Sequence, residues 1–139
     1  MMVNYVTAKI ALKASNNLFL SVIARDGKQT IEAAKSSIDS WCNLSLIFLG
    51  EENVALYAVN NAYLSRIYRG YAQTIEAAKS QMDPFCVFKL EVFDKDTIAL
   101  RADTGMYIGL VSRDGNNNIE TRSNTIDENS KFKVTSFET

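Results

Sequence analysis

The heptapeptide TIEAAKS occupies residues 30–36 and recurs, letter for letter, at residues 74–80. The chain aligns with itself at a shift of 44 residues, which places IALKASNNLFLSVIAR (10–25) on VALYAVNNAYLSRIYR (54–69). A second shift adds IALRADTGMYIGLVSR (98–113), and no insertion is needed anywhere. Self-similarity at a fixed period indicates tandem structural units. The sequence therefore predicts three repeats of 44-residue period: 10–53, 54–97 and 98–139.

Each repeat has the pattern of four short strands. Apolar and variable residues alternate at Ile10-Ala11-Leu12-Lys13 and at its copies, which predicts a first strand. A turn rich in Asn or Gly leads to a second strand around Leu18-Phe19-Leu20. A third strand is expected around Ile31, after a loop with Asp26-Gly27, and a fourth at Leu44-Ser45-Leu46. Three such repeats give twelve strands.

The repeated heptapeptide itself has a composition that favours a helix. However, the third copy reads IETRSN (119–124), which is a poor helix and an acceptable strand. Equivalent positions of a repeat share one backbone conformation, so the third copy decides. We predict a strand followed by a turn, with a single helical turn near Asp39.

Three four-stranded units are too few to close a propeller. Two strands from each unit can instead close a six-stranded barrel, while the other two form hairpins that cap one end. Closure removes exposed sheet edges. The fold class predicted is therefore an all-β, twelve-stranded β-trefoil. We expect one repeated set of residues in the barrel and another in the hairpin layer: Leu44, Phe88 and Phe132, then Phe19, Tyr63 and Tyr107.

A chain of 139 residues is expected to form a single domain, residues 1–139. Its 15 basic and 16 acidic residues give a formal net charge of −1. This balance leaves no electrostatic footprint for nucleic acid. No apolar run is long enough to span a bilayer, so we expect no membrane-spanning segment.

The compartment is predicted from the N-terminus and the cysteines. The start, MMVNYVTAKIALK, lacks the basic region and long apolar run of a secretory signal. We expect a cytoplasmic protein or one secreted without a leader. Cys42 and Cys86 occupy equivalent positions, with Ser130 at the third, and are expected to be buried and reduced.

The repeat resembles the fascin-type trefoil unit, through the residues Val54-Ala55-Leu56, Asn61-Ala62-Tyr63-Leu64-Ser65 and their copies in the third repeat. The stretch DPFCVFKLE (83–91) also resembles the entry to the fourth strand in amaranthin-type plant agglutinins. These resemblances imply the trefoil fold and three alternative activities: actin bundling, sugar binding or, as in other trefoils, protease inhibition. The Gln-x-Trp signature of ricin-type lectins is absent, and the only tryptophan is Trp41. The sugar site of that subfamily therefore cannot be transferred.

Catalysis is not expected. The chain has no histidine, which removes the usual general base and the Ser-His and Cys-His pairings. Two cysteines 44 residues apart match no zinc pattern, so no metal site and no cofactor are predicted. The acids Glu32, Glu76 and Glu120 recur once per repeat, which favours a framework role.

A second acidic set, Asp39, Asp83 and Asp127, precedes the fourth strand of each repeat. One interpretation is a polar ring that binds a ligand or a cation. The other is an Asx-type turn, in which the carboxylate accepts backbone N–H bonds. We favour the turn.

The loop between the second and third strands diverges between repeats and is the predicted ligand site. Exposed aromatic rings beside Arg, Gln, Asn and Asp suit a sugar, whose C–H face stacks on a ring and whose hydroxyls need polar partners. The alternative is a solvated loop with scattered tyrosines. Tyr68 and Tyr71 are expected to be more exposed than Tyr63. The candidate carbohydrate-binding residues are Tyr68, Arg69, Tyr71, Gln73, Arg25, Asp26, Gln29, Arg113, Asp114 and Asn117.

The function predicted is a non-enzymatic lectin with shallow sites for glycans or glycoconjugates on the repeats. Assembly into a homodimer would add avidity. The alternatives are a fascin-like trefoil that binds actin or another protein, and a protease inhibitor. The regularity of the repeats is also compatible with a recently duplicated or engineered chain.

Overall fold

Residues 5–137, which the computed structural model describes, form twelve strands and three short 3₁₀ helices. Four strands and one 3₁₀ helix follow in the same order in each repeat. The first repeat contains β1 (Val6–Lys13), β2 (Phe19–Arg25), β3 (Lys28–Lys35), η1 (Ser40–Cys42) and β4 (Leu44–Gly50). The second contains β5 (Asn53–Ala58), β6 (Tyr63–Tyr68), β7 (Gln73–Lys79), η2 (Pro84–Cys86) and β8 (Phe88–Asp94). The third contains β9 (Thr97–Arg101), β10 (Tyr107–Arg113), β11 (Asn116–Ser123), η3 (Glu128–Ser130) and β12 (Phe132–Ser136).

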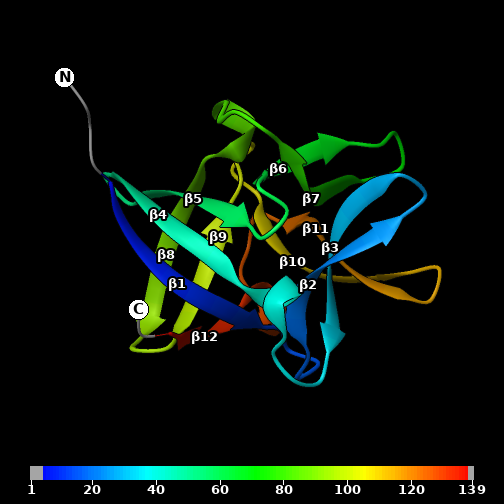
Figure 1. Cartoon of the computed structure of the whole chain (residues 1–139), viewed down its shortest axis with the longest axis horizontal. Coiled ribbons are helices and arrows are strands. Elements are labelled where there is room, and N and C mark those ends of the chain that lie inside the picture. The colour runs from blue at the N-terminus through cyan, green and yellow to red at the C-terminus, as the bar shows by residue number, and fades with distance from the viewer. Residues whose placement is uncertain (1–4, 138–139) are drawn as a thin grey trace.

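The first and fourth strands of the repeats close into a barrel. Antiparallel pairing runs from β1 to β4, β5, β8, β9 and β12, and β12 pairs again with β1. The strands that remain form the hairpins β2–β3, β6–β7 and β10–β11, which lie together on the right of Figure 1. This arrangement confirms the predicted β-trefoil, with its six-stranded barrel and three-hairpin cap.

The barrel interior is filled by apolar side chains from all three repeats. Leu44, Phe88 and Phe132, predicted to lie there, are buried in one continuous hydrophobic core. Phe19 packs instead against Ala11 and Cys42 in a small cluster of its own. A fully buried Leu or Phe side chain contributes roughly 1.5–3 kcal/mol of transfer free energy, so this shared core is the main force that joins the repeats.

The hairpins of the cap end in two-residue turns that match their sequences. Asp26 and Gly27 have φ of 50° and 79°, and Asp114 and Gly115 have φ of 54° and 80°. Positive φ at both positions defines a type I′ turn, for which Asp-Gly is a preferred sequence. In the second hairpin only Gly70 has positive φ, at 83°, as a type II′ turn requires.

The three hairpins also contact one another around the pseudo-three-fold axis. Thr30 of β3 lies opposite Glu76 of β7, Thr74 opposite Glu120 of β11, and Asn118 opposite Glu32. The repeated glutamates therefore meet at the centre of the cap.

The heptapeptide TIEAAKS forms strand in both of its copies, as predicted. Thr30 donates a hydrogen bond to Glu32, Ile31 and Ala33 are buried, and Lys35 binds Asp39. The side chains on one face of this strand therefore pack into the core, whereas Thr30 and Glu32 on the other face lie toward the pseudo-three-fold axis. Tertiary contacts override the helical propensity of the segment.

The repeated aspartates cap the 3₁₀ helices. Asp39, Asp83 and Asp127 each stand at the N-cap and accept a hydrogen bond from the backbone N–H two residues later. Of the two interpretations of this set, the turn is confirmed. Cys42 and Cys86 end their 3₁₀ helices as buried free thiols, with Ser130 at the equivalent place, also as predicted.

Candidate functional site

All of the predicted carbohydrate-binding residues lie on the three hairpins, but the strand pleat divides them between two faces. Arg25 lies opposite Lys28 in its hairpin, whereas Gln29 lies opposite Ala24, one residue further from the turn. Successive side chains of a strand point to opposite faces. Gln29 therefore faces away from Arg25. Tyr68, Gln73 and Asn117 occupy the same pairing step in the other two hairpins and share this outer face.

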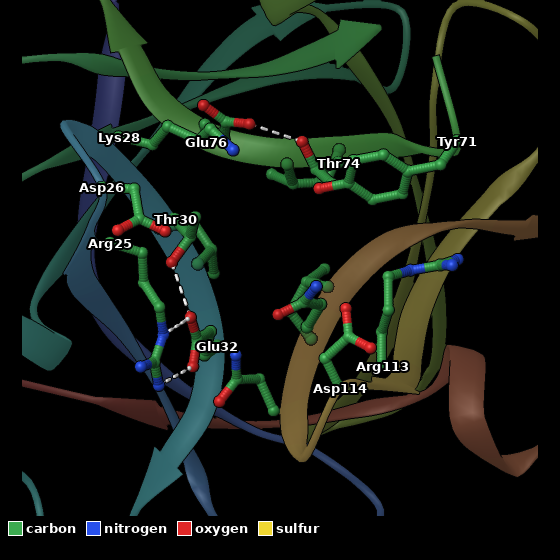
Figure 2. A pocket seen from close by; sticks show the side chains of 15 residues that line it. Arg25, Asp26, Lys28, Thr30, Glu32, Tyr71, Thr74, Glu76, Arg113 and Asp114 are labelled. Carbon is green, nitrogen blue, oxygen red and sulfur yellow. Dashed lines mark hydrogen bonds and ion pairs between the residues drawn. The ribbon is translucent and has the colours of Figure 1, made fainter. Parts of the chain in front are cut away.

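Half of the predicted residues line one pocket at the centre of the cap, called the axial pocket from here on. They are Arg25, Asp26, Tyr71, Arg113 and Asp114. The axial pocket has a volume of about 150 Å³, and each of the three hairpins contributes to its wall. Figure 2 shows these side chains arranged around it, with the guanidinium of Arg25 turned toward Glu32. Lys28 and Asn116, which the sequence did not single out, complete its polar rim.

A ring of ion pairs lies beneath the axial pocket. Arg25 contacts Glu32 through two hydrogen bonds of 2.8 and 2.9 Å, and Arg113 contacts Glu120 through two of 2.9 Å. Arg69 binds Glu76 in the same bidentate way. The exposed fraction of each of the three glutamates is only 1–2%. Buried carboxylates need such partners, and this ring supplies them in every repeat.

Two glutamates of this ring, Glu32 and Glu76, are held in the ionised form. Burial alone would raise the pKa of Glu32 and of Glu76. Hydrogen bonds from Arg25 and Thr30 outweigh that effect and hold the pKa of Glu32 below its ordinary value. Arg69 and Thr74 do the same for Glu76. The pairing of each acid with an arginine confirms the framework role predicted for this set.

Tyr71 is the exposed aromatic residue at the rim of the axial pocket. Its exposed fraction is 59%, and that of Tyr68 is 70%, whereas Tyr63 is half-buried. This order confirms the predicted difference in exposure. The guanidinium of Arg113 lies 5.2 Å from the centre of the Tyr71 ring. In Figure 2 the Tyr71 side chain points back over its own hairpin toward Thr74.

The predicted residues outside the axial pocket do not form a common site. Gln73 accepts a hydrogen bond from Arg66, and Arg69 is engaged by Glu76. Gln29 lines a shallow hollow of about 280 Å³ beside Trp41 on the first repeat. The outer face therefore carries separate polar residues, while the axial pocket gathers residues from every repeat.

Three further grooves were missed by the sequence reasoning. Each lies where the 3₁₀ helix and fourth strand of one repeat meet the first strand and following turn of the next. Their volumes are about 260 Å³ for the first–second groove, 720 Å³ for the second–third groove and 400 Å³ for the third–first groove. Equivalent positions line all three. The signal was the divergence of those positions between repeats, such as Tyr57, Arg101 and Lys13.

Metal and membrane features are limited in the described residues. Across residues 5–137, no group of three or more His, Cys, Asp or Glu side chains is arranged to hold a metal ion. No helix in the same range is long and apolar enough to cross a membrane.

No protein-family model and no curated protein matches this sequence. Solved structures do match its fold. The designed three-fold symmetric protein ThreeFoil superposes with a TM-score of 0.79 at 13% identity, over 93% of this chain and 99% of that one. A mosquitocidal holotoxin gives 0.77 at 11% identity over 99% of this chain, but the match spans only 18% of the toxin chain.

A lectin from Polyporus squamosus, solved with a human-type influenza-binding epitope, gives a TM-score of 0.75 at 10% identity. The match covers 98% of this chain and 50% of the lectin chain. Identities this low carry information about architecture alone. Together with the closed barrel and its cap of three hairpins, they identify the chain as a β-trefoil protein.

Proposed function

We propose that this protein binds carbohydrate without catalysing a reaction, and that the axial pocket with Tyr71 is its binding site. The observation that carries the proposal is the convergence of three hairpins on one hollow with an exposed tyrosine at its rim. An aromatic face beside fixed polar groups is the combination that a sugar ring requires.

The polar groups at the rim have hydrogen-bonding capacity to offer. Within the described residues, the side chains of Asp26, Asp114, Lys28 and Asn116 have no hydrogen-bond or ion-pair partner. They include both donors and acceptors, which sugar hydroxyls need. The ring arginines, in contrast, are committed to the glutamates and position the turns.

The size of the axial pocket limits what it can enclose. Its volume of about 150 Å³ lies below the roughly 300–1,000 Å³ typical of small-molecule pockets. A sugar would therefore stack on Tyr71 and insert one substituent into the hollow. Such a shallow contact gives weak binding at a single site, and avidity from assembly or from multivalent glycans would raise it.

The comparisons support the proposal at the level of architecture. A trefoil of known structure with nearly the same chain path is a lectin that was solved with a bound epitope. The lack of histidine in this chain and the arginine pairing of Glu32, Glu76 and Glu120 favour binding over acid–base chemistry.

The test is a glycan array, followed by titration of the strongest binder against two matched variants. Tyr71→Ala is expected to weaken binding about tenfold, the loss of one aromatic contact. Tyr5→Ala removes a tyrosine of similar exposure, 51%, that lies away from the hairpins, and it should leave binding unchanged. Silence of the folded protein across the array would refute the proposal, and pelleting with actin filaments would favour the protein-binding alternative.

A further inference from the structure

The third–first groove gathers three lysines at one repeat junction. Lys13 ends β1, Lys131 follows η3, and Lys133 lies on β12. All three line the same groove of about 400 Å³, whose floor includes the buried Phe132. This volume falls within the range of small-molecule sites.

Two of these lysines are forced together by the barrel pairing. Lys13 and Lys133 lie directly opposite each other on the neighbouring strands β1 and β12. Side chains at such positions project from the same face with their Cβ atoms about 5 Å apart, and like charges there are destabilising. The sequence thus places a repulsive pair inside a concave surface.

No carboxylate neutralises the three lysines within the described residues. None of them takes part in an ion pair. The ammonium groups of Lys13 and Lys131 instead lie over the rings of Phe19 and Phe93, at 4.9 and 5.1 Å. Aromatic contacts hold a cation in place but leave its charge uncompensated. Glu128 is the single acid in the lining, which leaves the groove with a surplus of two positive charges.

The second–third groove shows how the same fold balances a similar pair. There Lys89 lies opposite Arg101, but Glu91 contacts Arg101 at 3.1 Å. Asp103, which also lines the groove, is paired with Arg66 instead. The position equivalent to Glu91 is Thr135 in the third repeat. This counter-charge is therefore missing where the lysines gather.

The remaining junction shows that the barrel does not require the lysines. In the first–second groove the equivalent positions of Lys13, Lys131 and Lys133 hold Tyr57, Asn43 and Ser45. Because the internal repeats share one backbone, the barrel itself does not require three lysines at a single junction.

We propose that the third–first groove binds the anionic group of an acidic saccharide, a carboxylate or a sulfate, between Lys13, Lys131 and Lys133. The anion supplies the negative charge that Glu91 supplies beside Arg101 at the second–third junction. Ser15 and Thr97 line the same groove and offer hydroxyls to the sugar. That the anion belongs to a saccharide rests on the proposed function, while the demand for an anion rests on the groove itself.

The test is a titration of the whole protein at low ionic strength, in which binding is monitored through the backbone amide signals in NMR spectra. The probes are sialyllactose, a sulfated lactose, lactose and sodium sulfate. The two acidic saccharides are expected to shift the signals of Lys13, Lys131 and Lys133. Lactose should leave those signals in place, and sulfate alone should bind at least tenfold more weakly than the sulfated sugar.

Matched variants separate charge from structural damage. Thr135→Glu copies the acid that the equivalent position carries as Glu91, and it should weaken binding of the acidic saccharides at least tenfold. The double variant Lys13→Gln/Lys133→Gln should weaken binding of the acidic saccharides as much as Thr135→Glu does. Its stability should be unchanged or higher, because the variant removes the repulsion between the two lysines. Lys89→Gln in the second–third groove and Tyr71→Ala should leave binding to the groove intact.

Three outcomes would overturn the proposal. One is equal binding of lactose and its charged derivatives, and a second is equal binding of free sulfate. The third is full binding by Thr135→Glu. Shifts of the hairpin turns alone, abolished by Tyr71→Ala, would reject the groove while supporting the axial pocket. The failure of one site is therefore distinguishable from the failure of the other.

Discussion

Two regions of the molecule follow the same pseudo-three-fold symmetry: the ring of ion pairs at the axial pocket and the grooves between repeats. They differ in whether the same residues occupy the equivalent positions of all three repeats. The ring holds an Arg–Glu pair in every repeat, with nearly the same geometry. The grooves occupy equivalent places, yet their charged residues differ. The second–third groove is lined by two acids and two bases, whereas the third–first groove is lined by three lysines and one acid. Positions that the fold needs are repeated, and positions it does not need have become different from one another.

Because of this contrast, comparing the three repeats position by position separates residues that the fold needs from residues that it does not. A side chain present in all three repeats has a structural cause that can be sought in its contacts, as with Glu32 or Asp39. A charged side chain present once, at a place where the other repeats tolerate a different residue, needs another explanation. The following predictions test that division.

Removing one arginine of the ring has the largest expected effect. Arg69→Ala leaves the buried Glu76 without its ion-pair partner, and breaking a buried pair costs about 3–5 kcal/mol. We expect about 3 kcal/mol, because Arg69 itself retains 31% of its side-chain exposure. Urea denaturation measures the loss. The control, Lys79→Ala, breaks the more exposed pair with Asp83 and should cost less than about 1 kcal/mol.

Acid should weaken the same ring without any mutation. The pKa values of Glu32 and Glu76 in the folded protein lie below the ordinary value of 4.5. Their contribution to stability is therefore complete above about pH 4.5 and is lost as the pH falls through the lowered folded-state values. The midpoint of thermal unfolding should fall steeply in that range. A flat profile from pH 6 to pH 3 would contradict the assignment.

A smaller effect is expected where the third repeat departs from the other two. Ser130 is fully buried, and its Oγ has no hydrogen-bond partner among the described residues. An unsatisfied buried hydroxyl costs roughly 1–3 kcal/mol. Ser130→Cys, which copies Cys42 and Cys86, should therefore stabilise the protein by about 1 kcal/mol. The reciprocal change Cys86→Ser should destabilise it, and identical unfolding midpoints for both variants would disprove this reasoning.

The smallest expected effect concerns the turn between β4 and β5. Glu51 and Glu52 both have positive φ, 55° and 69°, as a type I′ turn requires. This conformation costs non-glycine residues about 1 kcal/mol each, and Asn-Gly suits it better. Glu51→Asn with Glu52→Gly should stabilise the protein by about 0.5–1 kcal/mol in urea denaturation. Gly27→Ala, at an equivalent backbone conformation, should do the opposite.

The fold was predictable because the repeats restrict one another. The third copy of TIEAAKS, with Thr121 and Arg122 in place of the two alanines, revealed a strand that single-segment propensity would have called a helix. The period-two pattern likewise placed Leu44, Phe88 and Phe132 in the barrel.

The binding surfaces were harder to predict, because they depend on which hairpin side chains share a face and on contacts between repeats. Tyr71 and Arg113 come together across two hairpins, and no local pattern predicts that meeting. The opposition of Lys13 and Lys133 likewise depends on the pairing of the first strand with the last. Whether the candidate residues bind sugar stays a prediction.

The pairing that joins Ile10 of β1 to Ser136 of β12 also governs how the chain can acquire its shape. During synthesis the barrel stays open until β12 emerges, with β1 and β9 each lacking a neighbour. Unpaired strand edges and exposed apolar surface promote association between nascent chains. Long-range strand pairing is also slow to form. A ribosome that stalls before Phe132 would therefore release a product with an open barrel that is prone to aggregation.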